Sequence, residues 1–255
     1  MNIFVLMKRT FDTEEKVQIK DNSIVEDGVE FIINPYDEYA IEEAIRIRDE
    51  VGGEVTVVTV GPEEAEKELR TALAMGADKA ILINPEGLKA DENTIANLLV
   101  AVLKDKQFDL LLGGNLSVDN GAGQVAVRVA EMLDIPQVTT ITKLELDGNQ
   151  AVVERDVEGD TEVIQVNLPA LFTAQQGLNE PRYPSLPGIM KAKKKPLEKL
   201  TPADLGLSEE QLVAHTETLS YHPPAAREAG RIMEGDLDQQ VKDLVRLLRE
   251  EAKVL

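Results

Sequence analysis

The first half of the chain alternates between short apolar runs and longer segments whose apolar residues recur with the period of a helix. Residues 2–7 and 54–60 are aliphatic and β-branched, which is typical of strands buried on both faces of a sheet. Between them, Asn34-Pro35 predicts a helix start, with an N-cap followed by proline at the first helical position. Strands and helices that alternate with short connections require right-handed crossovers. The chain is therefore predicted to fold as a doubly wound, Rossmann-like α/β sheet with parallel strands.

The alternation continues as far as Pro136 and then gives way to hairpins. Further helices and strands are expected at 62–76, 95–102 and 125–133, and at 79–83, 109–113 and 168–173, respectively. Strands of alternating polarity are expected at 139–146, 151–155 and 162–166. The turn pairs Asp147-Gly148 and Gly159-Asp160 separate them, and such pairs are typical of antiparallel hairpins. The hairpins are therefore expected to extend or flank the parallel sheet.

Composition limits the functions that the chain can have. It carries 47 acidic and 27 basic residues, a formal net charge of −20, and no cysteine. A surface this acidic repels phosphate backbones, which argues against nucleic acid binding, and the lack of thiols excludes disulfides and thiolate metal sites. No apolar run approaches the roughly 18 residues of a membrane span, and no signal peptide is evident. A cytoplasmic protein without membrane insertion is expected.

The sequence contains no recognisable catalytic constellation. The two histidines, His215 and His222, fall outside any ligand spacing. The carboxylates of Glu42-Glu43 and of the Glu63-Glu64-Glu66-Glu68 run are expected to form solvated helix faces, the common meaning of such runs. The chain is therefore predicted to hold a ligand rather than to act as an enzyme by itself.

The ligand site of a doubly wound sheet is expected beyond the carboxyl ends of its strands, where helices begin. Four segments fall there, at 6–8, 34–37, 60–61 and 113–125. In the last segment, Gly121-Ala122-Gly123 leads into a helix whose first backbone N–H groups are free to hold a phosphate. Neither a Walker motif nor GxGxxG is present. The small residues therefore have a second interpretation, as a tight connection that serves packing only.

Residues 177–195 read GLNEPRYPSLPGIMKAKKK and combine a proline-broken segment with a basic cluster. Proline fixes φ and removes a hydrogen-bond donor, so three prolines within seven residues argue against a helix. The segment is predicted to be an extended or turned arm that carries Leu186 near its tip, with the apolar pair Ile189 and Met190 behind it. A proline-rich domain linker is the alternative interpretation.

Several stretches resemble the β subunit of the electron transfer flavoprotein family. They are LNEPRYPSLPGIMKAKKK at 178–195, the preceding VERDVEGDTEVIQVNLPALFTAQQG at 153–177, INPYDEYAIEEAIRIRDE at 33–50 and ELRTALAMGADKAILI at 68–83. The resemblance runs in order from Asn2 to about Leu207 and is looser beyond. It implies an adenine-nucleotide-binding α/β fold and an electron carrier that works as a heterodimer with an α subunit.

The resemblance also implies cofactors and further partners. In this family, electrons pass from flavoprotein dehydrogenases, such as acyl-CoA dehydrogenases, to a quinone reductase or another acceptor. The redox FAD is held mainly by the α subunit, and the β subunit carries a structural AMP, which bifurcating members replace with a second FAD. Val125 stands where mitochondrial members have a threonine near the phosphate, and Thr13 where they have a tyrosine near the flavin. Both AMP and a second FAD therefore stay open.

Carried over position by position, the resemblance implies a nucleotide site and a set of partner-binding residues. The nucleotide site would comprise Leu6, Asn34, Pro35, Tyr36, Asp37, Val60, Asp119, Asn120, Gly121, Ala122, Gly123, Gln124 and Val125. The partner-binding residues would be Leu186, Pro187, Ile189, Met190 and Asp156. Leu186 matches an anchor that enters a hydrophobic pocket of the dehydrogenase, and Asp156 matches a carboxylate that pairs with an arginine of the α subunit. An ordinary surface charge in a hairpin is the alternative for Asp156.

Three regions are expected along the chain. They are an α/β nucleotide-binding domain at 1–176, with antiparallel additions after 137, a recognition arm at 177–207, and a tail at 208–255. An amphipathic helix in the tail is expected to pack on the partner subunit. The competing hypothesis is a stand-alone nucleotide-binding regulator of the universal stress protein type. The arm argues against it, because a lone sensor has no need of a stiff docking segment.

Overall fold

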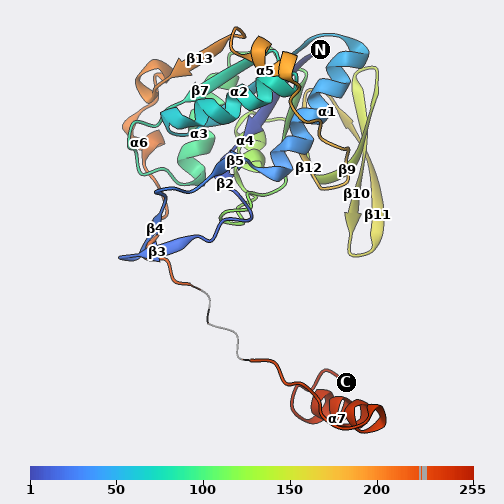
Figure 1. The fold of residues 1–255 in the computed structure, drawn as a ribbon. Helices are drawn as coiled ribbons and strands as arrows, with labels where there is room; N and C mark the ends of the chain where they lie inside the picture. The colour runs from blue at the N-terminus through green and yellow to red at the C-terminus, as the bar shows by residue number, and fades with distance from the viewer. Residues whose placement is uncertain (224, 226–228) are drawn as a thin grey trace. The chain divides into compact units, whose positions relative to one another are not determined.

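The computed structural model describes residues 1–223, 225 and 229–255 (Figure 1). The chain divides into two compact units, Met1–Leu219 and Ser220–Leu255. The larger unit contains the sheet with its covering helices, and it also contains the whole of the predicted arm.

The smaller unit contains helix α7 (Leu237–Glu250). It begins where the Asp236 side chain accepts a hydrogen bond from Gln239 N at 3.0 Å, a regular N-cap. Leu237, Val241 and Leu244 recur at helical spacing and are exposed. The predicted amphipathic helix is therefore confirmed, and its packing on a partner subunit stays a prediction.

The larger unit is built around a nine-stranded sheet of order β11-β10-β9-β12-β8-β1-β6-β7-β13. Its strands are β1 (Asn2–Met7), β6 (Glu54–Val60), β7 (Lys79–Ile83), β8 (Leu110–Gly114), β9 (Gln137–Asp147), β10 (Gln150–Val157), β11 (Asp160–Asn167), β12 (Ala170–Ala174) and β13 (Leu197–Leu200). In this order, the strands from β9 through β12, β8, β1, β6 and β7 to β13 run parallel to one another, whereas β10 pairs antiparallel with both β9 and β11. The predicted doubly wound sheet with antiparallel additions is confirmed.

Helices cover both faces of the sheet because successive strand residues point to opposite sides. The four main helices are α1 (Pro35–Val51), α2 (Glu66–Met75), α3 (Glu92–Leu103) and α4 (Val125–Met132). Buried residues of α1 and α2 pack with Ile3 and Val5 of β1, whereas those of α3 and α4 pack with Phe4 and Leu6. One strand therefore supplies two separate apolar layers, and their burial is the main stabilising term of the fold.

Between β1 and α1 the chain makes two small antiparallel pairs. β2 (Arg9–Phe11) pairs with β5 (Phe31–Ile33), and β3 (Gln18–Lys20) pairs with β4 (Ser23–Val25). The rings of Phe11 and Phe31 lie 4.9 Å apart between their centroids, a cross-strand contact that holds the first pair together. The excursion returns the chain to the carboxyl edge of the sheet, where α1 begins.

The prediction of an extended arm is wrong for helix α5 (Leu186–Ala192). Pro187 lies in the first turn, where an N–H has no intrahelical partner, so this proline favours a helix start. Ser185 caps the helix by accepting a hydrogen bond from Gly188 N at 3.1 Å. The chain then enters the sheet as edge strand β13 beside β7. Short helical turns complete the unit: η1 (Glu63–Ala65), η2 (Pro202–Leu205) and α6 (Glu209–Leu212).

Three carboxylates that the sequence predicted to be solvated are buried. Glu42, Glu43 and Glu68 are only 4%, 6% and 2% exposed. Glu42 accepts hydrogen bonds from Arg182, and Glu68 lies 3.3 Å from the Arg9 guanidinium. The prediction is wrong because each carboxylate meets a partner from a distant part of the chain: Glu42 and Glu43 accept hydrogen bonds, whereas Glu68 has only its ion pair with Arg9.

Candidate functional site

A pocket of about 300 Å³ lies at the carboxyl ends of β1, β6 and β8, beside the starts of α1, α3 and α4. Nine residues of the predicted nucleotide site line it: Leu6, Asn34, Asp37, Val60, Asn120, Ala122, Gly123, Gln124 and Val125. Parallel strands end at one edge of the sheet, which is why segments far apart in the sequence meet there. The structure therefore brings these residues together, and their binding of a nucleotide stays a prediction.

The other four predicted residues lie near the pocket without lining it. Pro35 is the first residue of α1, and Tyr36 follows it in a close contact with β8. Asp119 forms an ion pair of 2.7 Å with Lys8, which does line the pocket. Gly121 has a φ of +69°, a backbone conformation that residues with a Cβ rarely adopt, so glycine suits the turn at this position.

Asp37 is the polar centre of this edge. Its carboxylate accepts hydrogen bonds from Lys8 N at 2.6 Å, from Gly114 N at 2.9 Å and from Asn34 Nδ2 at 3.1 Å. A Cβ on Gly114 would lie 2.2 Å from the Asp37 carboxylate, so only glycine fits at this strand end. One side chain therefore joins the ends of β1 and β8 to the first turn of α1.

Burial dominates the electrostatics of Asp37. The residue is 5% exposed, and desolvation raises its pKa to about 7, although three N–H donors and the Lys8 charge act in the opposite direction. Ionisation of this buried carboxyl group therefore destabilises the folded state relative to its protonated form. We infer that its main role is to organise the backbone of the pocket.

Asn34 occupies the predicted N-cap position, but its side chain makes no capping hydrogen bond. Instead its Nδ2 donates to Leu116 O at 2.9 Å, and its Oδ1 accepts from Val118 N at 3.2 Å. The asparagine therefore ties the start of α1 to the loop after β8. This loop carries the predicted phosphate-binding residues.

The loop before α4 is closed by its own hydrogen bonds. Ser117 N donates to Ala122 O at 3.0 Å, and Asn120 Oδ1 accepts from Ala122 N at 3.1 Å. A Cβ on Gly123 would lie 2.9 Å from Asn115 O, so this glycine is required for packing within the loop. Packing and phosphate binding are compatible here, because the loop delivers the first turn of α4, which begins at Val125, to the pocket.

Sequence reasoning missed one wall of the pocket. It is formed by Ala90, Asp91, Glu92, Ile95 and Leu99 at the start of α3. Asp91 caps α3 by accepting from Thr94 N at 2.9 Å, and its second oxygen accepts from His215 N at 2.7 Å. Desolvation acts to raise the pKa of Asp91, but these hydrogen bonds and those from Thr216 together outweigh it and hold the pKa below its usual range. The Asp–Glu–Asn–Thr start of a helix at a strand end is the signal that would have located this wall.

Helix α5 presents large apolar side chains to solvent. Leu186 is 80% exposed, Met190 73% and Ile189 44%, and Pro187 beside them is also exposed. Ala192 on the same helix is buried against the core. The four predicted partner-binding residues of the arm therefore lie exposed together on one short helix. We call these four residues the docking surface, after the role that the sequence predicts for them.

The fifth predicted partner-binding residue, Asp156, lies apart on β10 and is exposed. Thr161 of β11 donates a hydrogen bond to its Oδ1 at 3.2 Å. Its neighbour Arg155 pairs with Glu162 at 2.8 Å and leaves Asp156 without a cation among the described residues. A free carboxylate at this position is consistent with either hypothesis, a surface charge or a contact to a partner arginine.

Neither a membrane span nor a metal centre is found in the parts of the chain that the structure describes. Within residues 1–223, 225 and 229–255, no helix is long and apolar enough to cross a bilayer. The same residues contain no cluster of three or more histidine, aspartate or glutamate side chains suited to a metal ion.

Fold and pocket together define a doubly wound α/β domain with a pocket at the carboxyl edge of its sheet, where such folds bind ligands. Comparison with known proteins narrows this class. Residues 21–205 match the family model described as the electron transfer flavoprotein domain. The chain is 61% identical to the electron transfer flavoprotein subunit beta of Bacillus subtilis over 257 residues, covering 100% of both chains.

Two more distant relatives agree. The corresponding subunit of Thermoanaerobacterium thermosaccharolyticum is 41% identical, over 97% of this chain and 98% of the relative. The human electron transfer flavoprotein subunit beta is 35% identical, over 100% of this chain and 99% of the relative. The chain therefore belongs to the β subunits of electron transfer flavoproteins, which makes it an electron carrier subunit.

Proposed function

We propose that the chain pairs with an electron transfer flavoprotein α subunit and passes electrons from flavoprotein dehydrogenases, such as acyl-CoA dehydrogenases, to a quinone reductase or another acceptor. The redox FAD, which accepts and releases the electrons, is bound mainly by the α subunit. This chain contributes a structural nucleotide site and the surface on which the dehydrogenase docks.

The single observation that carries this proposal is the exposure of Leu186 on α5. Large apolar side chains are normally removed from water in a folded unit, so an exposed leucine, methionine and isoleucine on one helix indicate a surface that a partner covers. Burying one leucine contributes about 1.5–3 kcal/mol, enough for one anchor to change affinity tenfold.

The pocket suits a mononucleotide. Leu6, Val60, Ile95 and Leu99 provide apolar walls for an adenine ring, and the start of α4 provides backbone N–H groups for a phosphate. Its volume of about 300 Å³ lies at the small end of the range for ligand sites. This size favours AMP over a second FAD. We therefore assign AMP to the pocket.

The test is to co-express the chain with its α subunit, purify the complex and identify the nucleotides released on denaturation. One FAD and one AMP per heterodimer are expected. Two FAD would refute the AMP assignment and indicate a bifurcating protein. A colourless homodimer with no affinity for the α subunit would contradict the electron-carrier proposal and favour a stand-alone nucleotide-binding regulator.

A further inference from the structure

The docking surface is carried by a helix too short to hold itself in place. Helix α5 spans seven residues, and isolated helices shorter than about 12–15 residues are marginal in water. Leu186 and Met190 are largely exposed and Ile189 is nearly half exposed, so these side chains contribute little burial to its stability. The orientation of the docking surface must therefore depend on the packing of α5 against α2, through Gly188 and Ala192, and on contacts at the two ends of the segment.

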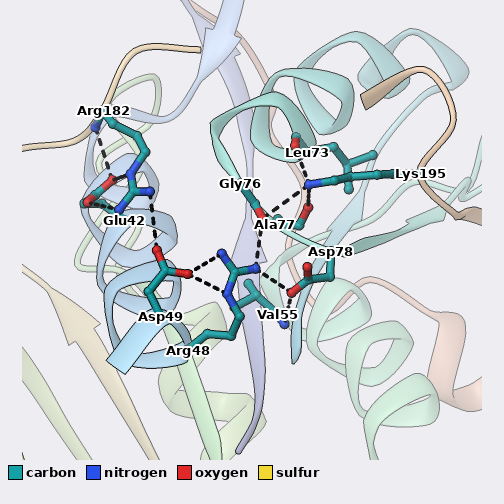
Figure 2. Close-up of polar contacts among 10 residues, drawn as sticks. All are labelled: Glu42, Arg48, Asp49, Val55, Leu73, Gly76, Ala77, Asp78, Arg182 and Lys195. Carbon is teal, nitrogen blue, oxygen red and sulfur yellow. Dashed lines mark hydrogen bonds and ion pairs between the residues drawn. The ribbon is translucent and has the colours of Figure 1, made fainter. Parts of the chain in front are cut away.

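The end after α5 is joined to α2 by a reciprocal pair of caps. Lys195 Nζ donates to Leu73 O at 3.0 Å, to Gly76 O at 3.3 Å and to Ala77 O, the carbonyl groups at the end of α2 (Figure 2). A cation at a helix C-terminus satisfies free carbonyls and interacts favourably with the helix dipole. Lys195 therefore fixes the chain that leaves α5 onto the end of α2.

Arg70 makes the opposite connection, from α2 to the end of α5. Its Nη1 donates to Ala192 O and to Lys195 O, both at 2.9 Å. Between these caps the two helices touch through their backbones, because a Cβ on Gly188 would lie 2.5 Å from Ala74 O. The two helices therefore pack closely at Gly188, and hydrogen bonds from Arg70 and Lys195 join the ends of α5 and α2.

The end before α5 is held by Arg182. Its Nε and Nη2 donate to the two oxygens of Glu42 at 2.8 and 2.9 Å, the bidentate geometry that arginine and carboxylate favour. Glu42 lies on α1 and is 4% exposed, so it offers a rigid acceptor. Asn179 adds a hydrogen bond to Glu43, the next residue of α1, at 2.9 Å.

A chain of polar contacts runs from Arg182, before α5, to Lys195, after it (Figure 2). Arg182 lies 3.6 Å from Asp49, and Asp49 pairs with Arg48 at 2.8 Å. Arg48 in turn donates to Gly76 O at 3.0 Å, the same carbonyl that Lys195 contacts. The two ends of the segment are therefore tied to one another through the C-terminal ends of α1 and α2.

We propose that Glu42 and Lys195 are positioning residues that hold α5 so that Leu186, Ile189 and Met190 face a docking partner. The inference rests on the proposed docking function. It extends that function to residues which do not touch the partner. Loss of either anchor lets α5 leave the docking orientation for part of the time. The apparent affinity for the partner then falls in proportion to the competent fraction.

The test is steady-state reduction of the purified heterodimer by an acyl-CoA dehydrogenase that reduces the wild type. Glu42→Gln is nearly isosteric and removes the charge that Arg182 contacts, and Lys195→Met removes the cap of α2. Each is expected to raise KM about threefold or more, as when a third of the molecules are competent, with kcat and FAD content unchanged. Amide hydrogen exchange across α5 should become faster.

Control variants separate positioning from charge and from folding. Lys67→Met removes an exposed cation from the same helix α2 and should leave KM unchanged. Lys195→Arg keeps a cation at the cap and should restore part of the affinity. Arg182→Gln should raise KM little further in the Glu42→Gln background, because both short hydrogen bonds of the Arg182 guanidinium go to Glu42 and only a 3.6 Å contact goes to Asp49.

The outcomes also distinguish this inference from the proposed function. If Leu186→Ala raises KM but Glu42→Gln and Lys195→Met do not, positioning is refuted and docking stands. If Leu186→Ala has no effect, docking through α5 is refuted and the inference falls with it. Heterodimers that lose FAD or fail to assemble in both anchor variants would show that the anchors serve folding, which also overturns the inference.

Discussion

The pocket and the docking surface belong to the same unit, but the pocket is built from buried polar groups and the docking surface from exposed apolar side chains. The pocket is organised by buried polar groups, with Asp37 accepting three N–H donors at the edge of the sheet. The docking surface consists of apolar side chains in water, and part-buried polar contacts hold the two ends of its segment. Changes at the buried polar groups of the pocket are therefore expected to affect folding and ligand binding together, whereas changes at the exposed side chains of α5 should affect partner binding alone.

The largest effect is expected from Asp37→Ala, because it leaves three buried or half-buried donors without their acceptor. We expect the free energy of unfolding to fall by about 3–5 kcal/mol, measured by denaturant titration. Asp105→Ala, which removes an exposed carboxylate, should change it by no more than about 0.5 kcal/mol. Equal losses in both variants would mean that Asp37 does not organise the pocket.

The raised pKa of Asp37 predicts a pH dependence that the docking surface lacks. A carboxyl group whose pKa is about 7 in the folded state and about 4 in the unfolded state binds more protons when folded. Its contribution to stability is therefore present at low pH and declines as pH rises through that range. Asp37→Asn should remove this decline, which unfolding titrations near pH 5 and near pH 8 would measure. An identical pH profile in wild type and variant would contradict the shift.

Leu186→Ala should show the reverse behaviour. Since Leu186 is 80% exposed, its truncation should leave thermal unfolding unchanged, but it should weaken dehydrogenase binding about tenfold or more. Val163→Ala removes an exposed apolar side chain from β11 and serves as the matched control. A drop in stability without a change in electron-transfer rate would show that Leu186 serves folding and not partner binding.

Gln124→Glu separates the stability of the pocket from its ligand binding. A carboxylate at the start of α4 interacts favourably with the helix dipole by about 0.3–1 kcal/mol, so the nucleotide-free protein should not lose stability. The same charge repels a phosphate, so AMP affinity should fall about three- to tenfold, measured by calorimetry after nucleotide removal. Gln18→Glu on exposed strand β3 is the control. Unchanged AMP affinity would place the phosphate elsewhere.

The smallest effect is expected at Asp156. As an exposed charge it contributes about 0–1 kcal/mol to stability, so Asp156→Ala should fold normally. If it pairs with an arginine of the α subunit, the electron-transfer rate should change at low ionic strength, and the difference should shrink as salt screens the pair over about 8–10 Å. Rates identical to wild type at both ionic strengths would leave Asp156 a hairpin surface charge.

Local patterns were sufficient to predict the α/β class and the edge of the sheet that carries the pocket. Strand and helix periods are properties of neighbouring residues, and the parallel arrangement follows from short crossovers. Nine of the predicted nucleotide-site residues line the pocket because strand ends and helix starts converge there whatever their side chains are. The wall at Asp91 was not predicted, because none of the four predicted segments follows the strand at 79–83, after which α3 begins.

The predictions that failed depended on position within an element or on distant partners. Three prolines argued against a helix, yet Pro187 begins one, because proline breaks a helix only beyond its first turn. Glu42 was expected in solvent, but Arg182, its partner, lies 140 residues further along the chain. No window of sequence contains both groups, so the pattern around Glu42 is indistinguishable from that of a solvated face.

The sequence by itself therefore determined the class of fold, the helix and strand order, the place of the pocket and the apolar composition of the docking segment. Only the tertiary structure decided that this segment is a helix, that both of its ends are anchored to α1 and α2, and that a buried glutamate and a capping lysine set its orientation. The physical reason is the range of the interactions. Backbone propensity and apolar period act over a few residues, whereas the partners of buried charges are chosen by the packing of the whole chain.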